Sequence, residues 1–173
     1  METREVLAEA FGRIRQLVEQ SATGLDGDAL AFRPEADANS IAWLAWHLTR
    51  IQDHHVSEIA DRPQCWIEDM WYQMFEMAPD PSRTGNGDTS AQVAALRPLG
   101  PEHLLGYQEA VFRRTLEYLS GVEAEELDRV IDRSYDPPVT VGVRLVSVLS
   151  DNLQHAGQAR YVRGIIDRMP APS

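Results

Sequence analysis

The chain has 173 residues, enough to bury a hydrophobic core, and we expect one domain spanning residues 1–173. Its 27 acidic residues outnumber 16 basic ones, and the formal net charge of −11 at pH 7 argues against nucleic acid or an anionic membrane as the main partner. The single cysteine excludes an intramolecular disulfide and fits a reducing compartment. The chain has no signal-peptide pattern and no apolar run near the roughly eighteen residues that span a bilayer, so we expect a soluble cytoplasmic protein.

Four segments have the spacing of amphipathic helices, with apolar residues recurring at i, i+3, i+4 and i+7. They span residues 3–21, 41–60, 102–120 and 140–168. Asn39 or Ser40 is placed to cap the second helix and Thr140 the fourth, because these side chains accept hydrogen bonds from the free amides of a first helical turn. The fourth segment contains no proline and is long enough for about 43 Å of helix.

A long crossing over residues 61–101 joins the second and third helices. It holds five prolines, three glycines and an aromatic cluster, with little periodicity. We expect only a short helix in it, near residues 67–76. Because a connection of this length can travel back along a bundle, the second and third helices are predicted to run parallel.

The other two connections are shorter. Residues 29–39 predict an extended connector because Pro34 disfavours helical backbone in the residue before it. Residues 121–139 predict one helical turn near 123–127, and strand-like alternation is limited to the run at 129–133. Together these elements predict an all-α protein, a four-helix bundle with a long irregular crossing between helices two and three.

Asp151 and His155 lie four residues apart in the fourth helix, so both project from one face, a single turn apart. A carboxylate oxygen and an imidazole nitrogen at this spacing can hold one divalent cation. The alternative is an ion pair on a solvated face, worth roughly 0.2–0.5 kcal/mol. The same stripe continues through Val148, Val162 and Ile166, which indicates the core-facing side. A carboxylate buried there needs a cation or strong donors, so the stripe favours a metal site.

His47, in the second helix, is the candidate third ligand. It lies within an apolar stripe, so the alternative is a core histidine that makes one hydrogen bond. His54 follows two turns later, about 10.5 Å along the helix axis, which is too far to bind the same ion. It could instead line the same cavity and assist proton transfer in catalysis.

Gln158 and three tryptophans are weaker candidates. Gln158 follows His155 by three residues on the same face and could orient a ligand or assist proton transfer, although a polar residue at the bundle's edge explains it equally well. Trp43, Trp66 and Trp71 are candidate substrate contacts. Their alternative role is packing within the core and the crossing.

Other chemistry is not indicated by the sequence. Cys65 has Arg62 as its one basic neighbour, and nothing around it identifies an activated thiolate. The chain contains no P-loop, no GxGxxG and no GxSxG, so nucleotide binding and serine hydrolysis lack support.

The segments NSIAWLAWHLTRIQDHH (39–55) and DNLQHAGQARYVRG (151–164) resemble the DinB/YfiT-like superfamily of metal-dependent bundle proteins. That superfamily includes thiol S-transferases and mycothiol-dependent maleylpyruvate isomerase. The resemblance covers most of the chain and implies a DinB/YfiT-like bundle in which His47, Asp151 and His155 bind a divalent metal. Many members have histidine in place of Asp151, whereas the mycothiol-dependent isomerase branch is similar in having a carboxylate there.

The resemblance also implies a function, that of a metal-dependent thiol S-transferase. The metal would be zinc, with nickel, manganese or iron also compatible with the ligand set. It would activate a low-molecular-weight thiol, mycothiol or bacillithiol, for attack on a small electrophilic substrate. Two alternatives stay open: a non-catalytic or stress-related bundle with a structural metal, and a metal-dependent hydrolase. The family commonly dimerises, so a homodimer is expected.

Overall fold

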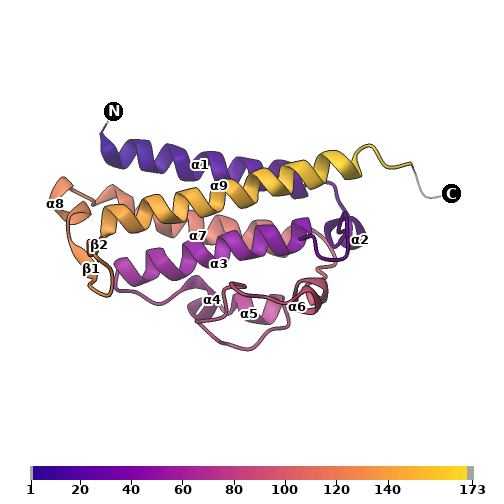
Figure 1. The fold of residues 1–173 in the computed structure, drawn as a ribbon, viewed down its shortest axis with the longest axis horizontal. Coiled ribbons are helices and arrows are strands. Elements are labelled where there is room, and N and C mark those ends of the chain that lie inside the picture. The colour runs from indigo at the N-terminus through magenta and orange to yellow at the C-terminus, as the bar shows by residue number, and fades with distance from the viewer. Residues whose placement is uncertain (1, 171–173) are drawn as a thin grey trace.

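The computed structural model describes residues 2–170, and four long helices dominate them. These are α1 (Thr3–Ala22), α3 (Ile41–Ile59), α7 (Glu102–Ser120) and α9 (Val141–Ile166). In Figure 1, α1 and α9 run in one direction and α3 and α7 in the other. Both α9 and α7 pack against α1 and α3. The predicted all-α four-helix bundle is confirmed, and α3 and α7 run parallel as expected.

Two of the helices begin at predicted caps. The Ser40 hydroxyl accepts a hydrogen bond from the Trp43 amide at 3.1 Å, and this bond fixes the first turn of α3. The Thr140 hydroxyl accepts from the Val143 amide at 3.4 Å, at the start of α9. Each cap satisfies an amide that has no partner within its helix. The first residues of α3 and α9 are therefore set by the side chains that directly precede them.

The crossing between α3 and α7 contains three short helices. They are α4 (Cys65–Glu68), α5 (Trp71–Met74) and α6 (Ser90–Ala95). The prediction of a single short helix near residues 67–76 is wrong. Met70 has left-handed backbone (φ 55°), which divides that stretch into two separate helical turns. Helix α6 was not predicted; Thr89 and Gln92 form a capping box at its start.

The remaining connections carry small elements. These are α2 (Gly27–Leu30), α8 (Ala124–Leu127), β1 (Val130–Asp132) and β2 (Val139–Thr140). The Asp26 carboxylate caps α2 by accepting from the Ala29 amide at 2.9 Å, so one helical turn precedes the extended connector. The expected turn near 123–127 is present as α8. The strand-like run pairs antiparallel with β2, with Val130 opposite Thr140.

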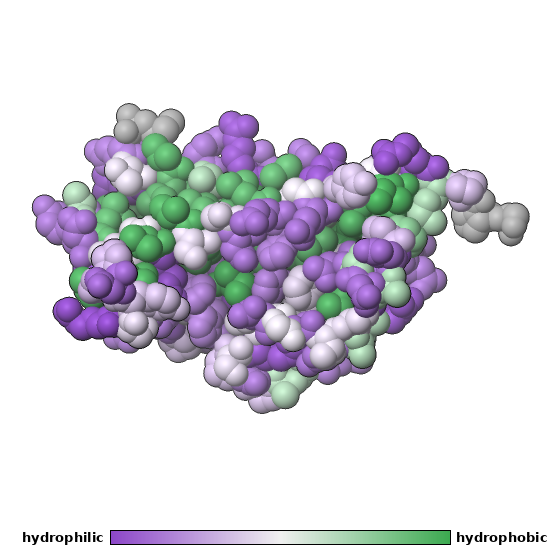
Figure 2. Space-filling view, viewed as in Figure 1, coloured by the Kyte–Doolittle hydropathy of each residue, from purple (hydrophilic) through white to green (hydrophobic). Residues whose placement is uncertain are grey.

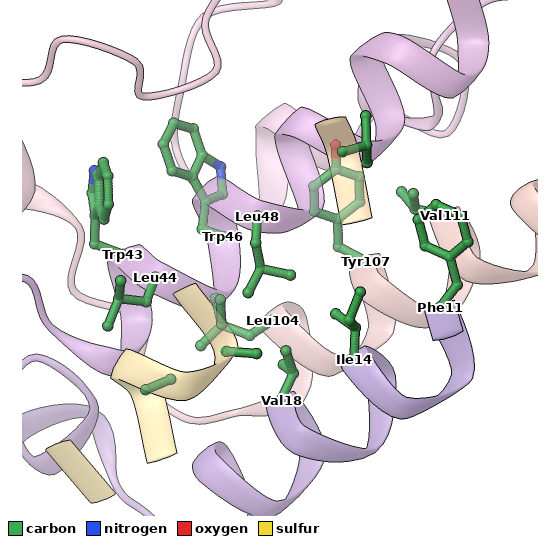
Figure 3. Close-up of a cluster of buried hydrophobic side chains, with 14 of the residues drawn as sticks. Phe11, Ile14, Val18, Trp43, Leu44, Trp46, Leu48, Leu104, Tyr107 and Val111 are labelled. Atoms are coloured by element: carbon green, nitrogen blue, oxygen red, sulfur yellow. The ribbon is translucent and has the colours of Figure 1, made fainter. Parts of the chain in front are cut away.

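The core lies between α1, α3, α7 and α9, and the close-up in Figure 3 shows the part that α1, α3 and α7 contribute. The side chains labelled there come from all three helices: Phe11, Ile14, Val18, Trp43, Leu44, Trp46, Leu48, Leu104, Tyr107 and Val111. Each large apolar side chain buried in this way stabilises the fold by about 1.5–3 kcal/mol. Every residue from 41 to 50 is buried, because α3 is covered by α7, α9 and the crossing. His47 therefore belongs to the most enclosed part of the bundle.

Apolar side chains are exposed on part of the surface that residues 2–170 form. Figure 2 shows apolar residues gathered over α1 and the first half of α9. Val6, Val143 and Val146 of these helices are each more than half exposed, at 51%, 55% and 61%. Within residues 2–170, none of the helices combines the length and the hydrophobicity needed to cross a membrane.

Candidate metal centre

The structure brings His47, Asp151 and His155 together at the contact between α3 and α9. One potential ligand atom from each residue lies within 4.8 Å of the others. The Nε2 atom of His155 is 3.6 Å from Oδ1 of Asp151. The two imidazole rings have centroids 4.8 Å apart and lie nearly perpendicular, at 78°. Three side chains from two helices thus converge on one point, which we call the triad.

Hydrogen bonds orient both histidine rings. Nδ1 of His47 lies 2.6 Å from the Thr84 carbonyl oxygen, which can only accept, so Nδ1 carries the proton and Nε2 keeps a lone pair. Nδ1 of His155 lies 3.0 Å from Oε1 of Gln158, which favours the same tautomer. A partner on the far ring nitrogen is the usual support of a metal-binding histidine. Both rings can therefore offer Nε2 to a cation.

The Asp151 carboxylate provides a test of whether the triad fits a cation. Its Oδ2 atom is buried and has no hydrogen-bond partner among the described residues. An unsatisfied buried acceptor costs about 1–3 kcal/mol, or more when it is charged. A divalent cation would satisfy this oxygen, and the donor set of two imidazoles and one carboxylate is one that such ions accept. The residues fit a metal.

The triad lies at the edge of the core. The His47 residue is 5% exposed, whereas the side chains of His155 and Asp151 are 18% and 37% exposed. The face of α9 that carries Asp151 was predicted to point into the core, and at Asp151 it is only partly buried. Solvent reaches the α9 side of the triad while the α3 side is closed, so a small molecule could approach from α9.

The local electrostatics favour a cation at His47 and Asp151, whereas at His155 a cation would have to displace a proton. Burial lowers the pKa of His47, with the Thr84 carbonyl opposing the shift. The Asp151 carboxylate raises the pKa of His155 against the effect of burial. Burial raises the pKa of Asp151, but the contact with His155 outweighs it and the net shift is downward. A neutral His47 and an ionised Asp151 are the forms that bind a cation.

The carbonyl that holds His47 comes from residues 81–88 of the crossing, which we call the clip. The buried Arg50 guanidinium donates to the carbonyl oxygens of Arg83 at 2.9 Å and Pro81 at 3.0 Å. Arg83 in turn pairs with Asp88, its Nη2 lying 2.9 Å from Oδ2. These contacts fix the backbone on both sides of Thr84. The clip therefore has little freedom to move away from His47.

Trp43 connects the clip to the triad from the other side. Its indole stacks on His47, with ring centroids 4.5 Å apart and planes 12° apart, and its Nε1 donates to Asp88 at 2.9 Å. Gly85 packs against the rings of His47, Trp43 and Trp46 with φ 92°. A Cβ on Gly85 would lie 2.9 Å from Nδ1 of His47 and 2.7 Å from Cζ3 of Trp46. Only glycine allows the clip to approach this closely.

Sequence reasoning missed the clip. Thr84, Gly85 and Asp88 lie in a stretch without helical or strand periodicity, so nothing local places them near α3. The signal that could have indicated them is the turn-forming sequence Gly-Asn-Gly-Asp at 85–88, which is typical of a tight loop.

The structure places His54 away from the triad. In this part of α3, it is the neighbouring His55 that faces α9, and its Nδ1 lies 2.7 Å from a nitrogen of Arg144. The Nδ1 of His54 lies 3.1 Å from the side-chain amide nitrogen of Gln64, a residue of the crossing. His54, His55 and Glu58 form a second group with metal-ligand spacing. The Arg144 guanidinium already supplies a positive charge there, so this group is less suited to a cation than the triad.

The tryptophans divide between two regions. Trp43 lies beside the triad, as described above. Trp66 is buried in an aromatic cluster with Phe75 and Tyr107, and Trp71 packs on the same tyrosine. Neither is brought to the triad, so the packing alternative describes Trp66 and Trp71 better than a substrate role.

A cleft of about 730 Å³ adjoins the triad on its α9 side. We call it the connector cleft, because the connector before α3 forms one wall and the second half of α9 the other. Its lining residues are Pro34, Glu35, Asp37, Ala38, Asn39, Leu44, Gly157, Gln158, Tyr161 and Val162. Gln158 both lines the cleft and accepts the His155 hydrogen bond, so the cleft and the triad share a side chain.

The fold is that of the DinB-like four-helix bundles, and comparison with known proteins defines the family. The family model described as Mycothiol-S-transferase matches residues 6–168, and the chain belongs to this family. A crystal structure of the conserved protein of a locus from Enterococcus faecalis has the same fold, with a TM-score of 0.90 and 28% identity. The similarity covers 98% of this chain and 99% of the other. No curated protein matches the chain.

Proposed function

We propose that this protein is a divalent-metal-dependent thiol S-transferase that joins a low-molecular-weight thiol, mycothiol or bacillithiol, to a small electrophile. The observation that carries the proposal is the triad, in which two oriented imidazoles and an unsatisfied carboxylate oxygen converge in a member of the mycothiol-S-transferase family. A metal bound there would lower the pKa of a thiol and supply a nucleophilic thiolate at neutral pH.

The chain's own residues have separate roles in this proposal. His47, Asp151 and His155 hold the ion, with zinc favoured and nickel, manganese or iron as alternatives. The Thr84 carbonyl and Gln158 hold the two rings in the binding orientation. Gln158 has no titratable group, so its role is orientation and not proton transfer.

Cys65 is not the nucleophile in this proposal. Its side chain is fully buried, and burial raises the pKa of the thiol well above its ordinary value. A thiolate at this position would be strongly disfavoured. The reacting sulfur is therefore assigned to an external thiol.

Two alternatives are weaker for specific reasons. A structural metal site is closed to solvent, whereas the Asp151 side chain is 37% exposed. A metal-dependent hydrolase would need a general base near the triad, and His54 lies elsewhere. The free, buried thiol of Cys65 suits a reducing compartment, which supports our proposal of a cytoplasmic location.

Thiol transfer tests the proposal directly. Zinc-loaded protein is mixed with mycothiol or bacillithiol and chlorodinitrobenzene, and the thioether product is quantified. We expect metal-dependent product with wild type and with Cys65→Ala, and none above background with His155→Ala. Zinc-loaded, folded wild type that gives only the background rate with a panel of thiols and electrophiles would refute the proposed activity.

A further inference from the structure

A chain of buried polar side chains crosses the bundle core next to the triad. The side-chain amide of Asn152 on α9 donates to Oε1 of Gln52 on α3 at 3.1 Å. The amide of Gln52 donates to the Thr115 hydroxyl on α7 at 2.8 Å, and that hydroxyl donates to the Val111 carbonyl at 2.9 Å. Gln52 is 2% exposed, and the other two side chains belong to residues that are 0% exposed. We call Asn152, Gln52 and Thr115 the polar chain.

The direction of these hydrogen bonds is fixed from the α7 end. A backbone carbonyl can only accept, so the Thr115 hydroxyl donates to Val111 and accepts from Gln52. Gln52 therefore turns its oxygen toward α9, where it accepts from Nδ2 of Asn152. The oxygen of the Asn152 amide is buried and has no hydrogen-bond partner among the described residues. The Asn152 amide thus has one orientation, with Nδ2 toward α3.

Stability does not account for the polar chain. Replacing both partners of a buried hydrogen bond by apolar groups of the same shape is often neutral or stabilising, and this chain also leaves one buried acceptor unsatisfied. Among residues 2–170, Asn152 and Gln52 form the one fully buried side-chain hydrogen bond between α3 and α9, since the bonds from Arg144 to His55 and Glu58 lie at least partly at the surface. A buried polar contact of this kind distinguishes one alignment of two helices from the others, as a buried asparagine does in coiled coils.

We propose that the polar chain positions the metal ligands, because it holds α9 against α3 at the rotation and height that bring Asp151 and His155 to His47. Its three side chains are positioning residues, since none of them offers a ligand atom to the triad. This inference rests on the proposed function, because it takes the triad as a metal centre.

The spacing along α9 shows how the polar chain sets the rotation of that helix. Asp151 lies about 100° round the helix from Asn152, and His155 lies about 60° round it on the same side. When Asn152 faces the core, both ligands therefore lie on the side where His47 completes the triad. A rotation of α9 that broke the bond to Gln52 would turn both ligands together.

The polar chain also fixes α9 along its axis. The bond to Gln52 lies within one helical turn of both α9 ligands, and Gln52 follows His47 by about 7.5 Å along α3. The core-facing residues of α9 beside the triad are Ala156 and Ala159, whose side chains are too short to interlock deeply with a neighbouring helix. Metal–ligand distances vary by only about 0.2 Å. A directional contact is therefore needed to set the alignment.

A substitution at the far end of the polar chain tests positioning without touching the triad. Thr115→Val keeps the shape of the side chain but removes the acceptor of the Gln52 amide. We expect zinc affinity, measured by competition with a chromophoric chelator, to fall roughly tenfold. Thr115→Ser keeps the hydroxyl and should keep the wild-type affinity.

Thr49→Val is the matched control. The Thr49 hydroxyl belongs to a residue that is also 0% exposed, but it donates only to the Ala45 carbonyl of its own helix, at 2.7 Å. Thr49 is closer in sequence to His47 than any member of the polar chain. Thr49→Val should nevertheless bind zinc like wild type.

A second variant separates positioning from stability. Gln52→Met/Thr115→Val/Asn152→Leu replaces the whole polar chain by apolar side chains of similar size, so its urea unfolding midpoint should be no lower than that of wild type. Its zinc affinity should still fall by roughly tenfold or more. The rings of His47 and His155 have centroids 4.8 Å apart, so their protons should show an NOE in metal-free wild type and lose it in this variant.

These measurements separate the positioning role from the proposed function. Unchanged zinc affinity in Thr115→Val or in the folded apolar variant would overturn the role. An equal loss in Thr49→Val and Thr115→Val would also overturn it, because the loss would then follow any buried hydroxyl. If zinc affinity is unchanged but wild type transfers thiol, the proposed function stands alone. If wild type binds no zinc, the proposed function fails and the NOE decides: its loss in the apolar variant supports the positioning role, and its persistence overturns that role as well.

Discussion

Gly85→Ala should weaken metal binding although Gly85 is not itself a ligand. The new Cβ would lie 2.9 Å from Nδ1 of His47, 2.7 Å from Trp46 and 3.3 Å from Trp43. These are separations at which the rings or the clip must shift. The His47 ring can move only by losing its 2.6 Å hydrogen bond to the Thr84 carbonyl or its stacking on Trp43.

The loss of stability in Gly85→Ala follows from two contributions. A non-glycine residue in left-handed backbone costs about 1–2 kcal/mol, and overpacking a filled core costs about 1–3 kcal/mol. Gly85→Ala should therefore lower the free energy of unfolding by about 2–5 kcal/mol. Loss of support for a ligand ring lowers metal affinity by roughly 10–100-fold, which is the expected effect on zinc binding.

Gly87→Ala is the matched control. Gly87 also has positive φ, at 79°, but a Cβ there meets nothing within 4 Å. It should lose only the conformational contribution, about 1–2 kcal/mol, and keep the wild-type zinc affinity. Urea unfolding measures stability, and competition with a chromophoric chelator measures affinity. Equal zinc affinity in folded Gly85→Ala and Gly87→Ala would show that the clip does not position His47.

Three further predictions concern charge, the buried network and assembly. Because Asp151 raises the pKa of His155 in the metal-free protein, their interaction adds stability below the ordinary histidine pKa of 6.5 and loses it as the pH rises through the raised value. The stability difference between wild type and Asp151→Asn should therefore shrink above pH 6.5 in denaturation curves, and a constant difference would contradict the pairing. Arg50→Met should cost about 3–5 kcal/mol, because it leaves the buried Asp53 carboxylate without its charge partner; a loss below about 1 kcal/mol in urea unfolding would contradict this role. The homodimer expected from the sequence stays a prediction. If two copies pair through the apolar area on α1 and α9, Val146→Glu should convert the dimer to a monomer, as measured by light scattering. Wild-type protein that is already monomeric would contradict the prediction.

Much of the bundle could be predicted because its signals are local. Ser40 and Thr140 mark the starts of α3 and α9 by side chains that bond amides three residues away. The spacing of Asp151 and His155 placed them on one helical face. The pairing of α3 with α9 is a long-range contact, which the choice of His47 as the third candidate ligand predicted and the resemblance to a known family supported.

The parts that could not be predicted depend on contacts distant in sequence. The clip reaches His47 because Arg50 bonds carbonyl groups more than thirty residues away. The division of the short helix depends on the backbone conformation of one residue, Met70, which no periodicity reveals. His54 was predicted as a residue that could line the same cavity, but its side chain contacts the crossing residue Gln64.

The most direct measurement for the central claim is the metal content per chain of untagged protein, by elemental analysis. The comparison includes Asp151→Ala, His155→Ala and a matched control, Asp167→Ala, which removes an aspartate of an ion pair at the end of the same helix. We predict one equivalent of divalent metal in wild type and in Asp167→Ala, and none in the two triad variants. Wild-type protein that stays metal-free after reconstitution with zinc, nickel, manganese and iron would contradict the account and leave the triad as a hydrogen-bonded ion pair.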